Sequence, residues 1–135
     1  MRCCRIIPII AVGLLIGSVA RGAAYRDVAI QTGETAGPVE QRVARLLQER
    51  LAEPGMAPVQ IGNTAASGTA TLTILLGRPE HHAALRDAME AEGIPPLTPL
   101  APGPEGFVLH LLPSGPGGTL LAAGIDDRGC LYAAG

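Results

Sequence analysis

The acidic residues best suited by type to catalysis are the adjacent pair Asp126 and Asp127. Glycoside hydrolysis requires two carboxyl groups that face each other across the scissile bond, roughly 5 to 9.5 Å apart. Side chains of adjacent residues normally point in different directions, so this pair is poorly placed to flank a sugar. A carboxylate at the start of a helix accepts hydrogen bonds from free backbone N–H groups. The pattern therefore favours helix capping over catalysis.

The adjacent histidines His81 and His82 are candidate metal ligands. Neighbouring residues on a helix point about 100° apart, so the two rings do not chelate one ion together. Glu80, His81 and His110 would converge only by an accident of the fold, and the sequence has no H-E-x-x-H or C-x-x-C spacing. We expect a solvated first helical turn here rather than a metal centre.

The sequence gives equally little support for a catalytic nucleophile or a phosphate-binding loop. Cys130 has no activating charge nearby except Arg128, so a buried packing thiol is expected. Ser67 and Ser114 lie outside any G-x-S-x-G elbow, and the glycines of residues 115–118 lack the Lys-Ser/Thr of a phosphate loop. We therefore assign no catalytic, cofactor-binding or metal-binding residue and expect no cofactor.

The N-terminus has the pattern of a signal peptide. Arg2 and Arg5 precede an apolar run at residues 6–20, and Gly22 and Ala24 offer a small-residue cleavage site. The run is about 15 residues long, shorter than the roughly 20 residues that span a bilayer. We expect residues 1–24 to be a cleaved signal peptide, with a retained anchor as the alternative.

Composition indicates the compartment and excludes some partners. Cleavage removes Cys3 and Cys4, so Cys130 remains alone and forms no internal disulfide. Export without disulfides is typical of a secreted or periplasmic bacterial protein, which would meet a membrane only during export. The net charge is −2 and the basic residues are scattered, so no nucleic-acid surface is predicted.

Sugar-binding modules usually present aromatic faces. Residues 25–135 contain only Tyr25, Phe107 and Tyr132, and Phe107 lies in an apolar strand where we expect it to be core. A dedicated carbohydrate-binding surface is therefore weakly supported.

The elements that carry these residues follow from periodicity. Apolar residues recur at helical spacing after Pro38, opposite a polar side that includes Glu40, whereas Leu72, Ile74 and Leu76 alternate as in a strand. Gly93 is a natural C-terminal cap. We expect strands at residues 26–31, 58–62, 70–76, 105–112 and 118–125, helices at 38–51 and 79–92, and loops at 63–68 and 94–104.

This order predicts an α+β, two-layer fold: a mixed β-sheet of about four to five strands with two helices packed on one face. Residues 25–135 would form one domain. Asp126 or Asp127 would cap a third helix, and the chain stops six residues after Gly129, inside that segment. We expect a domain truncated before a following one.

The order of motifs resembles a known domain. Residues 105–109 are similar to an "E-G-Y-x-L" strand, and residues 120–132 to an "I-x-G-x-D-x-R-G-x-L-Y-G" ending. Residues 39–51 and 72–77 resemble an "A-A-x-x-L-x-x-x-L" helix and an "I-x-I-G" strand. Together they resemble the N-terminal α/β domain that precedes the catalytic barrel in bacterial β-N-acetylhexosaminidases and α-glucuronidases. Ala133-Ala134 departs from the family's Gly after the Tyr.

The resemblance implies a non-catalytic accessory domain of a secreted carbohydrate-degrading glycoside hydrolase. Its partner would be a catalytic (β/α)8 barrel, in cis or in trans, and carbohydrate would be met only through the parent enzyme. Arg128 would pair with a carboxylate or carbonyl, and Gly129 would permit close backbone approach. The alternative is a free-standing envelope binding or adaptor protein. An exposed apolar face around Leu131 and Tyr132 would favour the accessory domain, and a polar, closed surface the adaptor.

Overall fold

Five strands and three helices make up the fold in a computed structural model, which describes residues 25–52, 54, 57–63, 71–114 and 116–135. The expected signal peptide and most of the loop at residues 63–68 lie outside these ranges. The elements, in chain order, are β1 (Asp27–Thr32), α1 (Pro38–Leu51), β2 (Val59–Gly62), β3 (Thr71–Gly77), α2 (Ala83–Ala91), β4 (Phe107–Ser114), β5 (Gly117–Gly124) and α3 (Asp127–Ala134).

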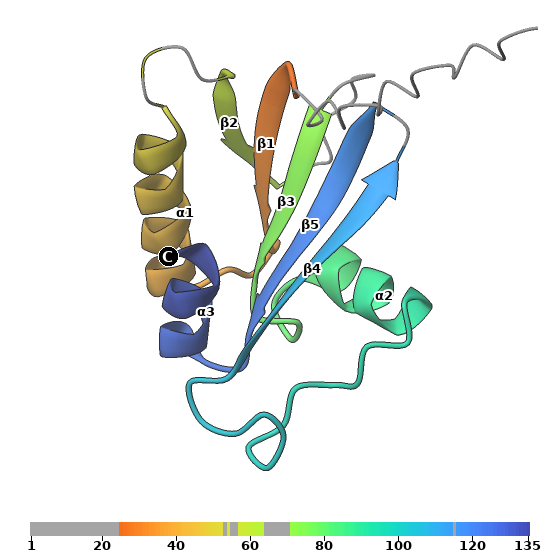
Figure 1. The fold of residues 1–135 in the computed structure, drawn as a ribbon. Coiled ribbons are helices and arrows are strands. Elements are labelled where there is room, and N and C mark those ends of the chain that lie inside the picture. Colours follow the sequence, from red (N-terminus) through yellow and green to blue (C-terminus); the bar gives the residue numbers. More distant parts are fainter. Residues whose placement is uncertain (1–24, 53, 55–56, 64–70, 115) are drawn as a thin grey trace, which may run out of the picture.

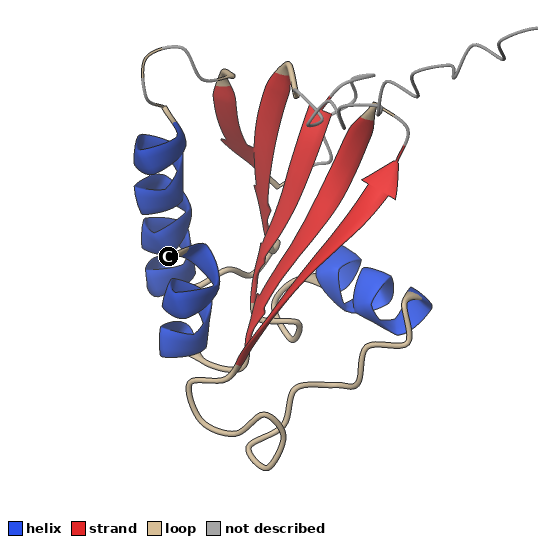
Figure 2. Ribbon diagram, in the orientation of Figure 1, coloured by secondary structure: helices blue, strands red, loops and turns tan. Residues whose placement is uncertain are grey.

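The strands form one mixed sheet in the order β2-β1-β3-β5-β4 (Figures 1 and 2). The first four strands of this order run parallel, and β4 joins β5 as an antiparallel hairpin partner. The predicted α+β class and mixed sheet are therefore confirmed, with five strands. Each described strand begins and ends within about two residues of its expected bounds.

The helices at residues 38–51 and 79–92, expected together on one face of the sheet, lie on opposite faces: α1 shares its face with α3, and α2 covers the other (Figure 1). The chain moves from β1 toward β2 in one lateral direction, and from β3 toward β5 and β4 in the other. Helix α1 belongs to the parallel β1–α1–β2 crossover, whereas α2 connects β3 to β4, which runs antiparallel to β3. The right-handedness of parallel crossovers therefore fixes the face of α1 and not that of α2.

Each face has its own apolar core. The core under α1 and α3 includes buried Ile30, Val43, Ile74, Leu76 and Ala133. The core under α2 is built from Leu75, Leu85, Met89, Leu121 and Ala123, with Ile94 and Leu97 of the following loop packed against it.

Helix α1 begins at Pro38, as the sequence predicts, because proline needs no hydrogen-bond partner in the first turn. Val43 and Ala44 are buried, whereas Val39 and Leu46, expected on the packed face, are about two-fifths exposed. Glu40, expected on the polar side, is only 1% exposed. The prediction for Glu40 was wrong because its carboxylate satisfies buried backbone groups.

Helix α2 begins at Ala83 rather than at Pro79, and the residues between β3 and His82 form a turn. The ring of His82 caps the helix, since its Nδ1 accepts the Leu85 N–H at 3.3 Å. Gly93 follows the helix with a φ of 67°, the left-handed conformation of a C-terminal cap, as expected.

Helix α3 begins after Asp126, as the sequence predicts. A Cβ at Gly129 would lie 2.4 Å from the carbonyl oxygen of Gly106, so only glycine allows this helix to approach the segment before β4. The close approach expected at Gly129 is confirmed.

Candidate functional site

Strand β4 presents a row of exposed apolar side chains on the face that carries α1 and α3. Leu109 and Leu111 lie opposite Ala122 and Leu120 of β5, which belong to the core under α1 and α3. Phe107 follows the same alternation. Phe107 is 43% exposed, Leu109 is 51% exposed and Leu111 is 49% exposed. The expectation that Phe107 is core was therefore wrong.

Helix α3, which contacts β4, also exposes apolar side chains. Leu131 and Tyr132 are 46% and 49% exposed, while Cys130 and Ala133 of the same helix are buried. We call Phe107, Leu109, Leu111, Leu131 and Tyr132 the apolar face.

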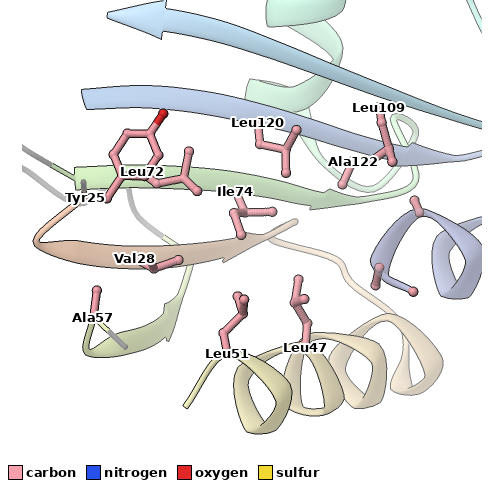
Figure 3. Close-up of a pocket in the computed structure, with 13 residues that line it drawn as sticks. Tyr25, Val28, Leu47, Leu51, Ala57, Leu72, Ile74, Leu109, Leu120 and Ala122 are labelled. Carbon is pink, nitrogen blue, oxygen red and sulfur yellow. The ribbon is translucent and has the colours of Figure 1, made fainter. Parts of the chain in front are cut away.

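A groove opens beside the apolar face, between α1, the sheet and the end of α3 (Figure 3). Its volume is about 580 Å³, and Leu109 belongs to both the groove and the apolar face. Figure 3 shows Leu47 and Leu51 of α1 pointing toward Ile74 of the sheet across this space. The side chains that line it are apolar except for the hydroxyl of Tyr25, which suits an apolar partner rather than a polar substrate.

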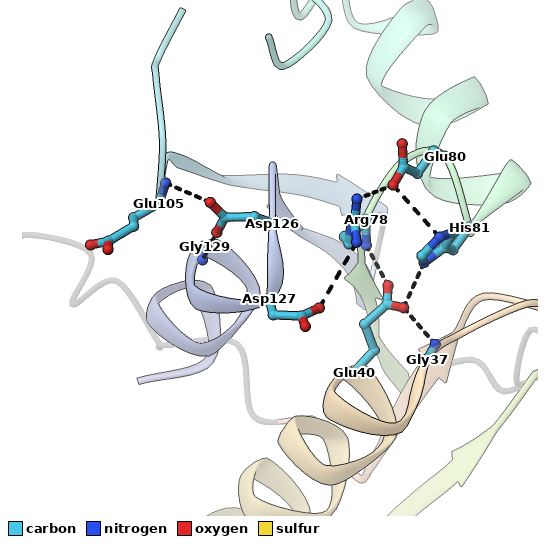
Figure 4. Close-up of polar contacts among 9 residues, drawn as sticks. All are labelled: Gly37, Glu40, Arg78, Glu80, His81, Glu105, Asp126, Asp127 and Gly129. Carbon is cyan, nitrogen blue, oxygen red and sulfur yellow. Dashed lines mark hydrogen bonds and ion pairs between the residues drawn. The ribbon is translucent and has the colours of Figure 1, made fainter. Parts of the chain in front are cut away.

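The second candidate site is a polar cluster around Glu40, at the carboxyl ends of the parallel strands (Figure 4). The carboxylate of Glu40 accepts hydrogen bonds from the backbone N–H of Gly37 at 2.7 Å and of Arg78 at 2.8 Å. The Nδ1 of His81 lies 2.7 Å from the same carboxylate. Burial alone would raise the pKa of Glu40, but these hydrogen bonds outweigh it and hold the pKa below its ordinary value.

Arg78 extends this cluster toward α3. Its guanidinium contacts Glu80 through Nη2 and lies 4.0 Å from Asp127 through Nη1, so it stands between two carboxylates in Figure 4. The arrangement joins the N-termini of α1 and α3 to the turn after β3. Its carboxylates are occupied by backbone donors and cations, which gives the cluster a structural role.

The histidines have different surroundings and different roles. His82 is 2% exposed, and its Nε2 lies 3.1 Å from the carbonyl oxygen of Gln31, so the expectation of a solvated turn was wrong for this residue. His110 lies on β4 with its Nε2 3.8 Å from a Glu92 carboxylate oxygen. Across the described ranges, no three His, Cys, Asp or Glu side chains are grouped to hold a metal ion.

The carboxylates of Asp126 and Asp127 diverge, as their adjacency predicts (Figure 4). Asp126 accepts the N–H of Gly129 at 2.7 Å and of Glu105 at 2.9 Å, and these hydrogen bonds lower its pKa. Asp127 faces Arg78 instead. Asp126 therefore caps α3 and anchors the segment before β4, while Arg128 pairs with Glu105 as expected.

The thiol of Cys130 is fully buried, and this burial raises its pKa to about 12. A thiol with this pKa stays protonated at neutral pH and is a poor nucleophile. Ser114 ends β4, and Ser67 and Gly115 lie outside the described residues.

Glu40 is the site residue that sequence reasoning missed, although two signals point to it. It lies at the third position of α1 after Gly37, where a glutamate reaches back to the N-cap N–H. It also shares the helical stripe of Val43, Ala44 and Leu47, which places it on the packed side.

Comparison of the chain with protein-family models, curated proteins and solved structures finds no match. Within the described residues, no helix has both the length and the apolar character needed to cross a bilayer.

Proposed function

We propose that this chain is the non-catalytic accessory domain of a secreted or periplasmic glycoside hydrolase of the hexosaminidase or α-glucuronidase type. Its partner is a catalytic (β/α)8 barrel, and the domain stabilises that barrel rather than reacting with substrate. The observation that carries the proposal is the apolar face, because large apolar side chains left exposed on neighbouring elements are what a protein interaction site presents.

The chemistry of the apolar face suits a protein surface better than a sugar. Phe107 and Tyr132 are its only aromatic side chains, and leucines make up the rest. Sugar platforms depend on aromatic stacking, whereas leucine-rich strand and helix surfaces pack against other apolar elements. The helices around a barrel present such elements.

The energy available at the apolar face favours a barrel in the same polypeptide. Fully burying one large apolar side chain contributes about 1.5–3 kcal/mol, so completing the burial of five half-exposed ones contributes about 4–7 kcal/mol. Association of a free partner costs roughly 4–15 kcal/mol in lost motion. A tethered barrel avoids most of that cost through its high effective concentration.

The alternative function, a free-standing envelope adaptor, fits a closed polar surface. The five side chains of the apolar face argue against it, because an isolated soluble protein that exposes them together is prone to association.

The native size of the protein tests this proposal. The secreted and envelope fractions of the source organism would be blotted with an antibody against residues 26–93. The same antibody would then precipitate the protein, and the precipitate would be assayed with aryl N-acetyl-β-glucosaminide and aryl glucuronide substrates. We expect a band several times larger than the chain, with glycosidase activity in the precipitate. A chain-sized band with precipitated activity would indicate a barrel in trans. A chain-sized band without activity would overturn the proposal in favour of the adaptor.

A further inference from the structure

A second cavity lies on the α2 side of the molecule, away from the apolar face. Its volume is about 1070 Å³, and it is enclosed by the turn after β3, helix α2 and the proline-rich loop that follows it. Arg78 and Ile125 of its lining immediately follow β3 and β5. These strands are parallel neighbours, and ligands of α/β sheets bind beyond the carboxyl ends of such strands.

The lining combines an apolar wall with a few charged groups, as small-molecule sites do. Met89, Ile94 and Leu97 form the apolar wall, and all three also pack in or against the α2 core, which holds them in place. Pro95 and Pro96 restrict the backbone of the loop. The cavity is therefore largely formed before any ligand enters, which reduces the entropy cost of binding.

Arg78 supplies the polar recognition group. Its Nε is buried and has no hydrogen-bond partner among the described residues, while its Nη2 contacts Glu80. A carboxylate binds a guanidinium side-on through Nε and one Nη together, and this bidentate pair is stronger than a single contact. Glu80 uses one of these two donors and leaves the other unsatisfied.

Glu80 can leave this position at the cost of its 3.6 Å contact with Nε2 of His81. Its side chain is 59% exposed, so it can turn into solvent when another carboxylate arrives. With Glu80 turned away, the charged groups that line the cavity are Arg78, Arg86 and Glu90. Asp127 stays 4.0 Å from Arg78 Nη1 and Asp87 stays 3.6 Å from Arg86 Nε, on the guanidinium atoms that the incoming carboxylate does not use.

We propose that this cavity binds a small organic carboxylate with an apolar body, whose carboxylate replaces Glu80 on the Nε–Nη2 edge of Arg78. The apolar body lies against Met89, Ile94 and Leu97. This binding does not depend on a catalytic barrel, so it stands or falls separately from the accessory-domain proposal.

The test is an NMR titration of the full chain with 4-phenylbutanoate and with its neutral counterpart 4-phenylbutan-1-ol. We expect saturable shifts of the Met89, Ile94 and Ile125 methyl groups with the acid, and at least tenfold weaker binding of the alcohol. Val28 and Ile74 lie at the groove on the other face and serve as internal controls that should not shift. Equal affinity for acid and alcohol, shifts centred on the groove, or no saturable binding of the acid would each overturn the proposal.

Variants separate recognition by Arg78 from general charge effects. We expect Arg78→Met to weaken acid binding at least tenfold, Arg78→Lys to weaken it less, and Glu80→Gln to tighten it severalfold by removing the competing charge. Arg50→Met removes a cation from α1, far along the chain from the cavity, and should leave the affinity unchanged. An unchanged affinity in Arg78→Met, or weaker binding in Glu80→Gln, would contradict the proposed geometry. The comparison of acid and alcohol on the wild-type chain remains decisive if a variant fails to fold.

Discussion

The two faces of strand β4 both carry large apolar side chains, but they differ in how far these are buried. On the α2 side, Val108 and Leu112 are half-buried against the α2 core and its following loop. On the α3 side, Leu109 and Leu111 stand half exposed beside an open groove. Composition does not predict which side is exposed, because both sides carry large aliphatic residues and the one polar ring, His110, lies on the better covered α2 side.

The difference lies in what reaches each face. Helix α2 is followed by a loop whose Ile94 and Leu97 extend the cover across β5 to β4. Helix α3 has eight residues, and its buried side packs over β5 and against α1. An apolar strand face that its own domain leaves uncovered is what a docking surface requires. One face of β4 therefore completes the fold, and the other is available to a partner.

The largest expected difference in stability is between two leucine variants, one on each side of the β4–β5 hairpin. Leu121→Ala on β5 removes a fully buried side chain of the α2 core and should lower the free energy of unfolding by about 2–5 kcal/mol. Leu109→Ala, on the exposed face of the neighbouring strand, should lower it by less than about 1 kcal/mol. Urea denaturation of both variants checks this. Equal losses would mean that the α3 side is as tightly packed as the α2 side.

The next effect concerns the anchor of α1. Glu40→Ala leaves the Gly37 and Arg78 N–H groups buried without an acceptor and should cost about 3 kcal/mol of stability. Glu40→Gln keeps an acceptor oxygen and should cost less. The exposed neighbour Gln41 provides a matched control through Gln41→Ala, which should be close to neutral. A neutral Glu40→Ala variant would show that the cluster does not hold α1.

A smaller effect is expected at the base of α3. Gly129→Ala gains about 1 kcal/mol of helix propensity but places a Cβ against the Gly106 carbonyl oxygen, which forces the helix away from the segment before β4. Because the obstacle is backbone, we expect a net loss of about 1–2 kcal/mol. Arg128→Ala removes an exposed ion pair, which solvent screens, and should change stability less than Gly129→Ala does. Thermal melts of the two variants test this order. A larger drop in melting temperature for Arg128→Ala than for Gly129→Ala would contradict it.

The smallest effect is the pH dependence of the α2 cap. Burial lowers the pKa of His82 below its ordinary 6.5, so the folded protein binds fewer protons than the unfolded chain in this range. The stability contributed by the neutral ring is complete above about pH 6.5 and is lost as the pH falls through the lowered pKa. His82→Asn keeps a capping side chain without this titration. Denaturation at several pH values between about 7 and 5 should give a shallower slope for the variant, and equal slopes would contradict the assignment.

Much of the fold was predictable because its signals are local. The helical spacing of Val43 and Leu47 after Pro38, and the alternation of Leu72 and Ile74, set the types of α1 and β3 without tertiary information. Asp126 capped α3 as expected, because a carboxylate before a helix acts within one turn.

The errors arise where long-range contacts decide. Glu40 and His82 are polar residue types that the fold buries, because backbone N–H and carbonyl groups from distant segments meet them there. Strand β4 is apolar at successive positions, so its sequence alone predicts burial on both faces and not the exposure of Phe107. The cover on each face depends on which side of the sheet each helix and loop packs, which no local pattern records.

The central claim is that the apolar face is covered by a partner in the native protein. Hydroxyl-radical footprinting of the native product and of the isolated chain tests it directly, with Phe107 and Tyr132 as reporters. Leu100, which is 95% exposed in the loop before β4, serves as the internal reference. We predict that Phe107 and Tyr132 are labelled several times more slowly in the native product while Leu100 is unchanged. Equal labelling of Phe107 and Tyr132 in both samples would contradict the account.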